Sequence, residues 1–85
     1  MADQSNDDEI LELVRFMVSS IIGEEVDIDL ETEVADGELR IDVRVPSEHR
    51  GRIIGRHGRV ARSMRNVLTA SRFDRPERIK LDIVD

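Results

Sequence analysis

The 85-residue sequence contains no cysteine, no tryptophan and no tyrosine, and it has only two phenylalanines. The absence of cysteine excludes disulfides, thiolate metal sites and cysteine nucleophiles. The shortage of aromatic side chains disfavours a nucleic-acid site in which bases stack on aromatic platforms. No apolar run approaches the roughly 20 residues that span a bilayer, and the acidic N-terminus is not typical of a secretory signal. We therefore expect a cytoplasmic protein without a membrane segment.

Motifs of catalysis and metal binding are also missing. The two histidines lack ligand spacing, and the alternating acids Asp27, Asp29 and Glu31 lack the glycine and the distal glutamate of a calcium loop. The sequence has neither a Gly-Lys-Ser/Thr phosphate loop nor a nucleophile elbow. We therefore expect no enzymatic activity, no metal ion and no cofactor.

The net charge is −6, but the charged residues are distributed unevenly along the chain. Residues 1–49 hold fifteen acidic residues against three arginines, a net charge of −12, whereas residues 50–73 hold seven arginines and no acidic residue. Charges more than about 8 Å apart are largely screened at physiological salt, so a polyanion responds to the local basic segment. Charge alone fits either a polyanion-binding surface or a solvated arginine-rich helix face.

The first part of the chain predicts a flexible segment and then a helix. Residues 1–8 show no apolar periodicity, and we expect them to form a flexible acidic N-terminus before a single domain over 9–85. Apolar residues then recur at helical spacing as far as Gly23, which predicts a helix over 8–22 with Asn6 as its N-cap.

Further along, the apolar spacing changes twice. Alternation on either side of Asp36-Gly37, a tight-turn signature, predicts a hairpin with strands over 26–34 and 39–45. The remaining elements are two helices and a strand, over 47–54, 58–72 and 78–84. On the second of these helices, apolar residues including Val60, Met64 and Val67 fall within an arc of roughly 120°. The arginines of this helix lie opposite that arc, namely Arg59, Arg62, Arg65 and Arg72.

This α-β-β-α-α-β order predicts an α+β fold with two layers. Because two helices separate the strands 39–45 and 78–84, we expect those strands to pair in parallel. The result is a three-stranded mixed sheet with 39–45 in the centre. All helices would then pack on one sheet face, and the charged residues of the other face would be exposed.

The segment Gly55-Arg56-His57-Gly58 is the most informative stretch of the sequence. One short helix ends there and the next begins, so unpaired backbone amides and a positive helix end are expected at the turn. Such a position attracts phosphate, and Arg56 and Arg59 add guanidinium donors. A bare Gly-x-x-Gly, however, is more often a helix–helix turn than a ligand site.

In the predicted frame, the segment Ile53-Ile54-Gly55-Arg56-His57-Gly58 resembles the GXXG loop of a type II K-homology (KH) domain. The likeness covers residues 9–84, and the chain resembles the KhpA family of small bacterial RNA-binding proteins. The resemblance implies a module that holds about four nucleotides of single-stranded RNA or DNA, with the loop on the backbone and an aliphatic groove receiving the bases. Arg56 and His57 stand where family loops often have Lys or Gln, and both are compatible with phosphate.

The residues to which we assign RNA binding are Arg52, Ile53, Ile54, Gly55, Arg56, His57, Gly58, Arg59, Val60 and Arg62. The resemblance further implies an RNA-chaperone or post-transcriptional role and a link to cell-envelope growth and cell length. It also implies pairing of the chain with itself or with the larger KH protein KhpB. The alternative is a KH-fold module whose surface serves protein assembly and has no direct role with nucleic acid.

Overall fold

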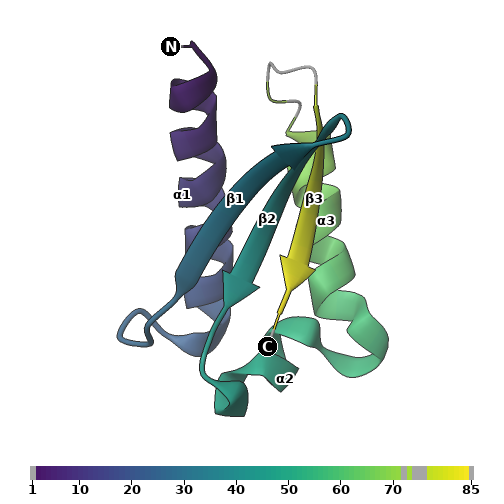
Figure 1. The fold of residues 1–85 in the computed structure, drawn as a ribbon. Helices are drawn as coiled ribbons and strands as arrows, with labels where there is room; N and C mark the ends of the chain where they lie inside the picture. The colour runs from purple at the N-terminus through teal and green to yellow at the C-terminus, as the bar shows by residue number, and fades with distance from the viewer. Residues whose placement is uncertain (1, 72, 74–76, 85) are drawn as a thin grey trace.

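A three-stranded sheet lies against two long helices in the computed structural model (Figure 1). The structure describes residues 2–71, 73 and 77–84. The elements follow the predicted order, with a short 3₁₀ helix added between the last two helices. They are α1 (Ala2–Ile22), β1 (Asp29–Ala35), β2 (Glu38–Arg44), α2 (Ser47–Ile54), η1 (Arg56–Gly58), α3 (Arg59–Ala70) and β3 (Arg78–Ile83). The predicted α+β class is confirmed.

The strand β2 is the centre of the sheet, as predicted. It pairs antiparallel with β1 and parallel with β3. The parallel register places Leu39 beside Ile79 and Ile41 beside Leu81, so the apolar residues of both strands share one sheet face. The crossover through α2 and α3 therefore joins two parallel neighbours, which confirms the pairing inferred from the order of elements.

The Asp36-Gly37 turn fixes the hairpin and one end of β3. Both residues have positive φ, 53° and 76°, which is the type I′ pattern of a two-residue hairpin. The turn lets Ala35 pair with Glu38. In addition, the Arg78 amide donates to the Gly37 carbonyl at 3.0 Å, so β3 begins against the same turn.

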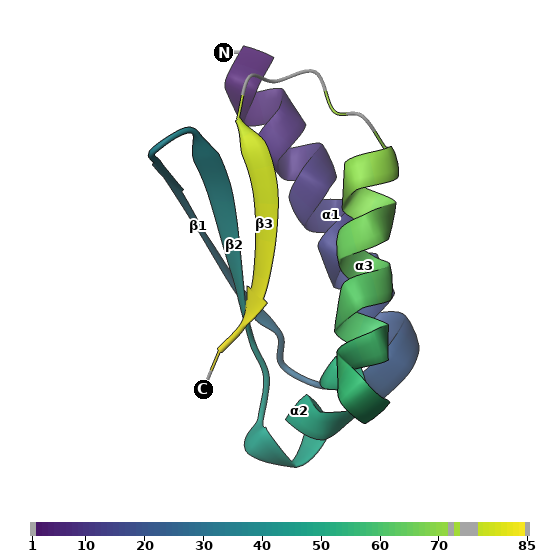
Figure 2. The ribbon, with the colours of Figure 1, turned by 90° about the vertical axis from the view of Figure 1, so that its right-hand side faces the viewer.

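The core lies between the sheet and the helices, which cover one sheet face only (Figure 2). It is built from aliphatic residues of α1, β2, α2, α3 and β3, and its most deeply buried members are Ile10, Val14, Val18, Leu39, Ile41, Val43, Ile53, Leu68 and Leu81. The opposite sheet face carries exposed charged residues, including Arg40 and Arg44. Ion pairs join the strands there, including Arg40–Asp82 at 3.8 Å and Arg44–Glu31 at 3.4 Å. The prediction of one covered and one exposed sheet face is confirmed.

Two element boundaries differ from the predictions by three residues or more, and several others differ by one or two. Helix α1 begins at Ala2 rather than at residue 8, so Asn6 lies within the helix and is not its N-cap. Acidic residues near the positive end of a helix stabilise it, which favours the extension despite the lack of apolar periodicity. Strand β1 begins at Asp29 rather than at residue 26. The flexibility of residues 1–8 stays a prediction.

The apolar alternation also overstated the burial of β1. Val34 is 55% exposed, because the tip of the hairpin lies away from the helices (Figure 2). Its neighbour across the strands, Leu39, is buried. An edge strand can thus alternate like a core strand although no helix covers its far end.

Two identical substitutions test this difference in burial. Val43→Ala removes two methyl groups from the core and is expected to lower the free energy of unfolding by about 2–3 kcal/mol. Val34→Ala at the exposed hairpin tip is expected to cost less than about 1 kcal/mol, the span of strand propensities. Urea denaturation followed by circular dichroism measures both. Equal losses would contradict the arrangement of the hairpin.

Candidate nucleic-acid interface

The Gly55–Gly58 loop joins α2 to α3 at one end of the molecule (Figure 1). The Gly55 amide donates to the Gly51 carbonyl at 2.9 Å and completes the last turn of α2. The Gly58 amide then donates to the Gly55 carbonyl at 3.0 Å, which closes the short helix η1. The predicted turn is therefore an ordered 3₁₀ turn between two helices.

Three of the four loop residues have positive φ. Gly55 has φ 78° and ψ 170°, a backbone region that is essentially restricted to glycine. His57 has φ 58° and Gly58 has φ 73°, both in the left-handed region. A left-handed non-glycine residue is strained, and such strain is concentrated at functional sites.

The two glycines are needed for different reasons. A Cβ atom on Gly55 would lie 2.8 Å from Cβ of Val60 and 2.9 Å from the Val60 backbone nitrogen, so the loop backbone rests directly on α3. A Cβ atom on Gly58 would meet nothing within 4 Å. Gly58 thus leaves the loop backbone accessible to a ligand, whereas Gly55 allows the loop to pack closely on Val60 of α3.

The 3₁₀ turn determines which backbone amides remain available. It uses the amides of Gly58 and Arg59, which donate to the carbonyls of Gly55 and Arg56. The amides of Arg56 and His57 precede these and have no carbonyl partner within the turn. Donors without a partner in the turn therefore lie within the loop itself, just before the α3 amides from which the sequence predicted anion binding.

The basic side chains around these amides are exposed and have no acidic partner among the described residues. Arg56, His57, Arg59 and Arg62 are exposed. In the part of the chain that the structure describes, none of their side chains has a hydrogen-bond or ion-pair partner. Three guanidinium groups thus lie around the loop, and no carboxylate of the described residues pairs with them. This arrangement suits an external anion.

Other arginines of the basic segment are used within the fold. Nη2 of Arg52 donates to the Ile21 carbonyl at 2.7 Å, and Nε of Arg65 donates to the Leu81 carbonyl at 2.9 Å. Arg65 lies opposite the apolar arc of its helix, as predicted, but its long side chain reaches back to β3. Arg72 lies outside the described residues.

The aliphatic residues beside the loop divide between core and surface. Ile53 is fully buried, so the expectation that it offers an apolar surface to bases is wrong; it anchors α2 in the core instead. Ile54 is 36% exposed, and Val60 is half-buried beneath Gly55. Ile54 is therefore the most accessible of the three residues that were expected to contact bases.

An apolar groove between α1 and α3 was missed by the sequence reasoning. It has a volume of about 300 Å³ and is lined by Phe16, Met17, Ser20, Ile21, Val60, Ser63, Met64 and Val67. Phe16 is 68% exposed and Val67 is 43% exposed, although Val67 was expected on the core side of its helix. The sequence feature that could have indicated this groove is Phe16, an aromatic residue outside the apolar stripe of its own helix.

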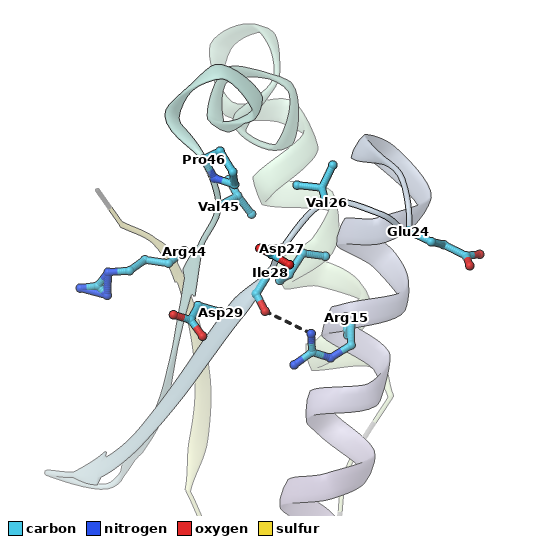
Figure 3. A pocket seen from close by; sticks show the side chains of 9 residues that line it. All are labelled: Arg15, Glu24, Val26, Asp27, Ile28, Asp29, Arg44, Val45 and Pro46. Carbon is cyan, nitrogen blue, oxygen red and sulfur yellow. Dashed lines mark hydrogen bonds between the residues drawn. The ribbon is translucent and has the colours of Figure 1, made fainter.

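A larger hollow among the described residues lies elsewhere (Figure 3). It has a volume of about 640 Å³, and its lining includes Arg15, Glu24, Asp27, Asp29 and Arg44. Nη1 of Arg15 donates to the Ile28 carbonyl at 3.2 Å across it. Three carboxylates disfavour a phosphate there, and none of the predicted site residues lines this hollow.

The described residues contain neither a membrane-spanning helix nor a cluster of metal ligands. Within 2–71, 73 and 77–84, no helix is both long enough and apolar enough to cross a membrane. In the same residues, no group of three or more His, Cys, Asp or Glu side chains could hold a metal ion.

Comparison with known proteins identifies the family. The family model described as "KhpA/KhpB, KH domain" matches residues 11–83. The chain belongs to this KhpA/KhpB family of KH domains. The resemblance seen in the sequence is thereby confirmed, and the Gly55–Gly58 loop lies within the matched residues. The membership also agrees with the prediction that the chain is not an enzyme.

Several curated relatives span nearly the whole chain. The RNA-binding protein KhpA of Borreliella burgdorferi is 33% identical over 75 residues, covering 88% of this chain and 92% of the relative. The RNA-binding protein KhpA of Treponema pallidum is 31% identical, with coverages of 87% and 92%. The RNA-binding protein KhpA of Lactiplantibacillus plantarum is also 31% identical, with 91% of each chain covered. No solved structure matches the chain.

Alanine at the two loop glycines tests the geometry of the turn. Gly58→Ala adds only left-handed strain, which costs about 1–2 kcal/mol. Gly55→Ala adds strain in a glycine-only region and also overpacks Val60, so we expect a further loss of about 1–3 kcal/mol. Chemical denaturation of both variants measures the difference. A Gly55→Ala protein as stable as Gly58→Ala would contradict the packing of the loop on α3.

Proposed function

We propose that the chain binds single-stranded RNA by holding the sugar-phosphate backbone at the Gly55–Gly58 loop. One observation carries the proposal: the arginines around the loop are exposed and have no carboxylate partner among the described residues. The curated relatives support RNA as the ligand, because each of those cited is named an RNA-binding protein.

Each part of the loop has a role in the proposed clamp. The amides of Arg56 and His57 donate to phosphate oxygens, and the guanidinium groups of Arg56, Arg59 and Arg62 supply charge-assisted hydrogen bonds. The open space beside Gly58 lets the sugar-phosphate chain approach the protein backbone. Ile54 offers aliphatic surface to a neighbouring base. The clamp contacts phosphates chiefly, so it reads little base sequence.

A clamp of this size binds weakly by itself. Contacts with about three phosphates and one or two bases correspond to micromolar affinity, about −8 kcal/mol. A second binding module raises the effective affinity without any new kind of contact. We therefore propose that the chain acts as a dimer, either with a second copy or with a KhpB-like KH protein.

The groove between α1 and α3 is the surface we propose for a second copy. Arg59 lies at the end of the groove near the loop, and Glu9 and Glu12 continue the Phe16 side of α1 toward the opposite end. A twofold axis through the groove would place the basic end of one protomer against the acidic end of its partner. The exposed Phe16 would then fill apolar space on the partner.

The cellular role follows from the resemblance to the KhpA family. We propose a cytoplasmic RNA chaperone or post-transcriptional regulator that acts with a KhpB-like partner in cell-envelope growth and cell-length control. The family description, which joins KhpA and KhpB, supports that partner. The alternative function, a protein-assembly module without RNA, is supported by the same apolar groove.

Charge reversal at the loop tests RNA binding. Arg56→Asp is expected to weaken binding of a short unstructured RNA by about 10- to 100-fold, because a charge-assisted hydrogen bond becomes a repulsion. The double variant Arg56→Asp, His57→Asp should abolish binding. Fluorescence anisotropy measures affinity, and circular dichroism verifies the fold.

Lys80→Asp is the matched control for the single variant Arg56→Asp. Lys80 is exposed on the uncovered sheet face, so the substitution changes the net charge equally but far from the loop. We expect it to leave RNA affinity within about twofold at physiological salt, where distant charges are screened. Unchanged affinity in the double loop variant would favour the protein-assembly alternative.

Dimerisation is tested at Phe16. Phe16→Asp buries a charge in the proposed interface and is expected to raise the dimer dissociation constant by more than about tenfold. Val34→Asp, an exposed valine at the hairpin tip, is the control and should leave it unchanged. Sedimentation equilibrium measures both. A monomeric unmodified protein, or equal effects of the two variants, would contradict the proposed surface.

A further inference from the structure

We infer that Arg52 is a positioning residue for the loop: it fixes the orientation of α2 against α1 and does not contact RNA. The inference deepens the proposed function and rests on it. Arg52 was expected among the RNA-binding residues because it belongs to the basic segment. The structure instead directs its guanidinium group to the end of another helix.

The contact is specific to the C-terminal end of α1. Nη2 of Arg52 donates to the carbonyl of Ile21 at 2.7 Å. Ile21 lies in the last turn of α1, where carbonyls have no partner within the helix and the helix dipole is negative. Gly23, with φ 107°, ends the helix and leaves that turn accessible. The guanidinium group thus donates a hydrogen bond to the Ile21 carbonyl, and its positive charge also offsets the negative end of the helix dipole.

Helix α2 is short and has a small share in the core. It is eight residues long, has no side-chain cap at its N-terminus, and buries only Ile53 among its described residues. A single fully buried side chain does not by itself fix the direction of a helix. The bond between Arg52 and Ile21 attaches the last turn of α2 to a different element.

A tilt of α2 would reach the loop directly. Arg52 lies one helical turn before Gly55, and Gly55 rests on Val60 of α3. The positive-φ conformation of the loop and the directions of the Arg56 and His57 amides depend on how α2 and α3 meet. A change at Arg52 is therefore expected to misalign the donors that hold the phosphate, without removing any of them.

The salt dependence of RNA affinity separates positioning from contact. Each phosphate contact on a single strand contributes about −0.7 to the slope of log affinity against log salt concentration. We expect Arg52→Ala to raise the dissociation constant for a short unstructured RNA by about 3- to 10-fold, the loss of one ordinary hydrogen bond, with the slope unchanged. Arg56→Ala, which removes a contact, should flatten the slope by about 0.7.

Two further variants and one spectrum complete the test. Arg52→Lys keeps a donor for the Ile21 carbonyl and should retain affinity within about twofold. Ile10→Val lowers stability through the core, at a distance from α2, and should leave RNA affinity unchanged at a temperature where every variant is folded. In the RNA-free protein, the amide NMR signals of residues 55–58 should shift in Arg52→Ala but not in Ile10→Val.

The possible results are distinguishable. A flattened slope in Arg52→Ala, equal to that in Arg56→Ala, would make Arg52 a phosphate ligand and overturn the inference. Unchanged affinity in Arg52→Ala would also overturn it. If Arg56→Ala changes neither affinity nor slope, the proposed RNA clamp fails. The loop amide signals then decide the role of Arg52, and unmoved signals would reject positioning.

Discussion

The close packing of Gly55 on Val60 is the contact on which the loop depends. It brings the end of α2 directly onto the start of α3, and a side chain at position 55 would collide with α3. The chain must then turn within two residues, which places His57 and Gly58 in the left-handed region. This sharp turn leaves the amides of Arg56 and His57 without partners in the 3₁₀ turn. The conformation of the loop and its capacity for an anion thus have one steric origin.

Partition of charge explains how an acidic protein can present a site for a polyanion. The net charge is −6, yet residues 50–73 contain no acidic residue. The fold divides the arginines of that segment between two tasks. Arg52 and Arg65 donate to backbone carbonyls of other elements, whereas Arg56, Arg59 and Arg62 are exposed around the loop. A phosphate would meet the second group without displacing a contact that holds the fold.

Features set by local sequence were predictable, and features set by tertiary packing were not. The Asp36-Gly37 turn, the parallel pairing of β2 with β3 and the GXXG loop each follow from a short pattern or from the order of elements. The burial of Ile53 does not, since α2 is too short to show which of two adjacent isoleucines faces the core. The partners of Arg52 and Arg65 depend on where α1 and β3 lie. Likewise, alternation did not reveal that the helices leave Val34 uncovered.

Amide chemical-shift mapping of the unmodified protein during titration with a short single-stranded RNA tests whether the Gly55–Gly58 loop holds the RNA backbone. We expect the largest shifts at residues 55–59 and smaller shifts at Ile54 and Arg62. Residues of the uncovered sheet face, such as Arg40 and Lys80, should be unaffected. Shifts concentrated on that face, or the absence of any shift at the loop with RNA in excess, would contradict the account.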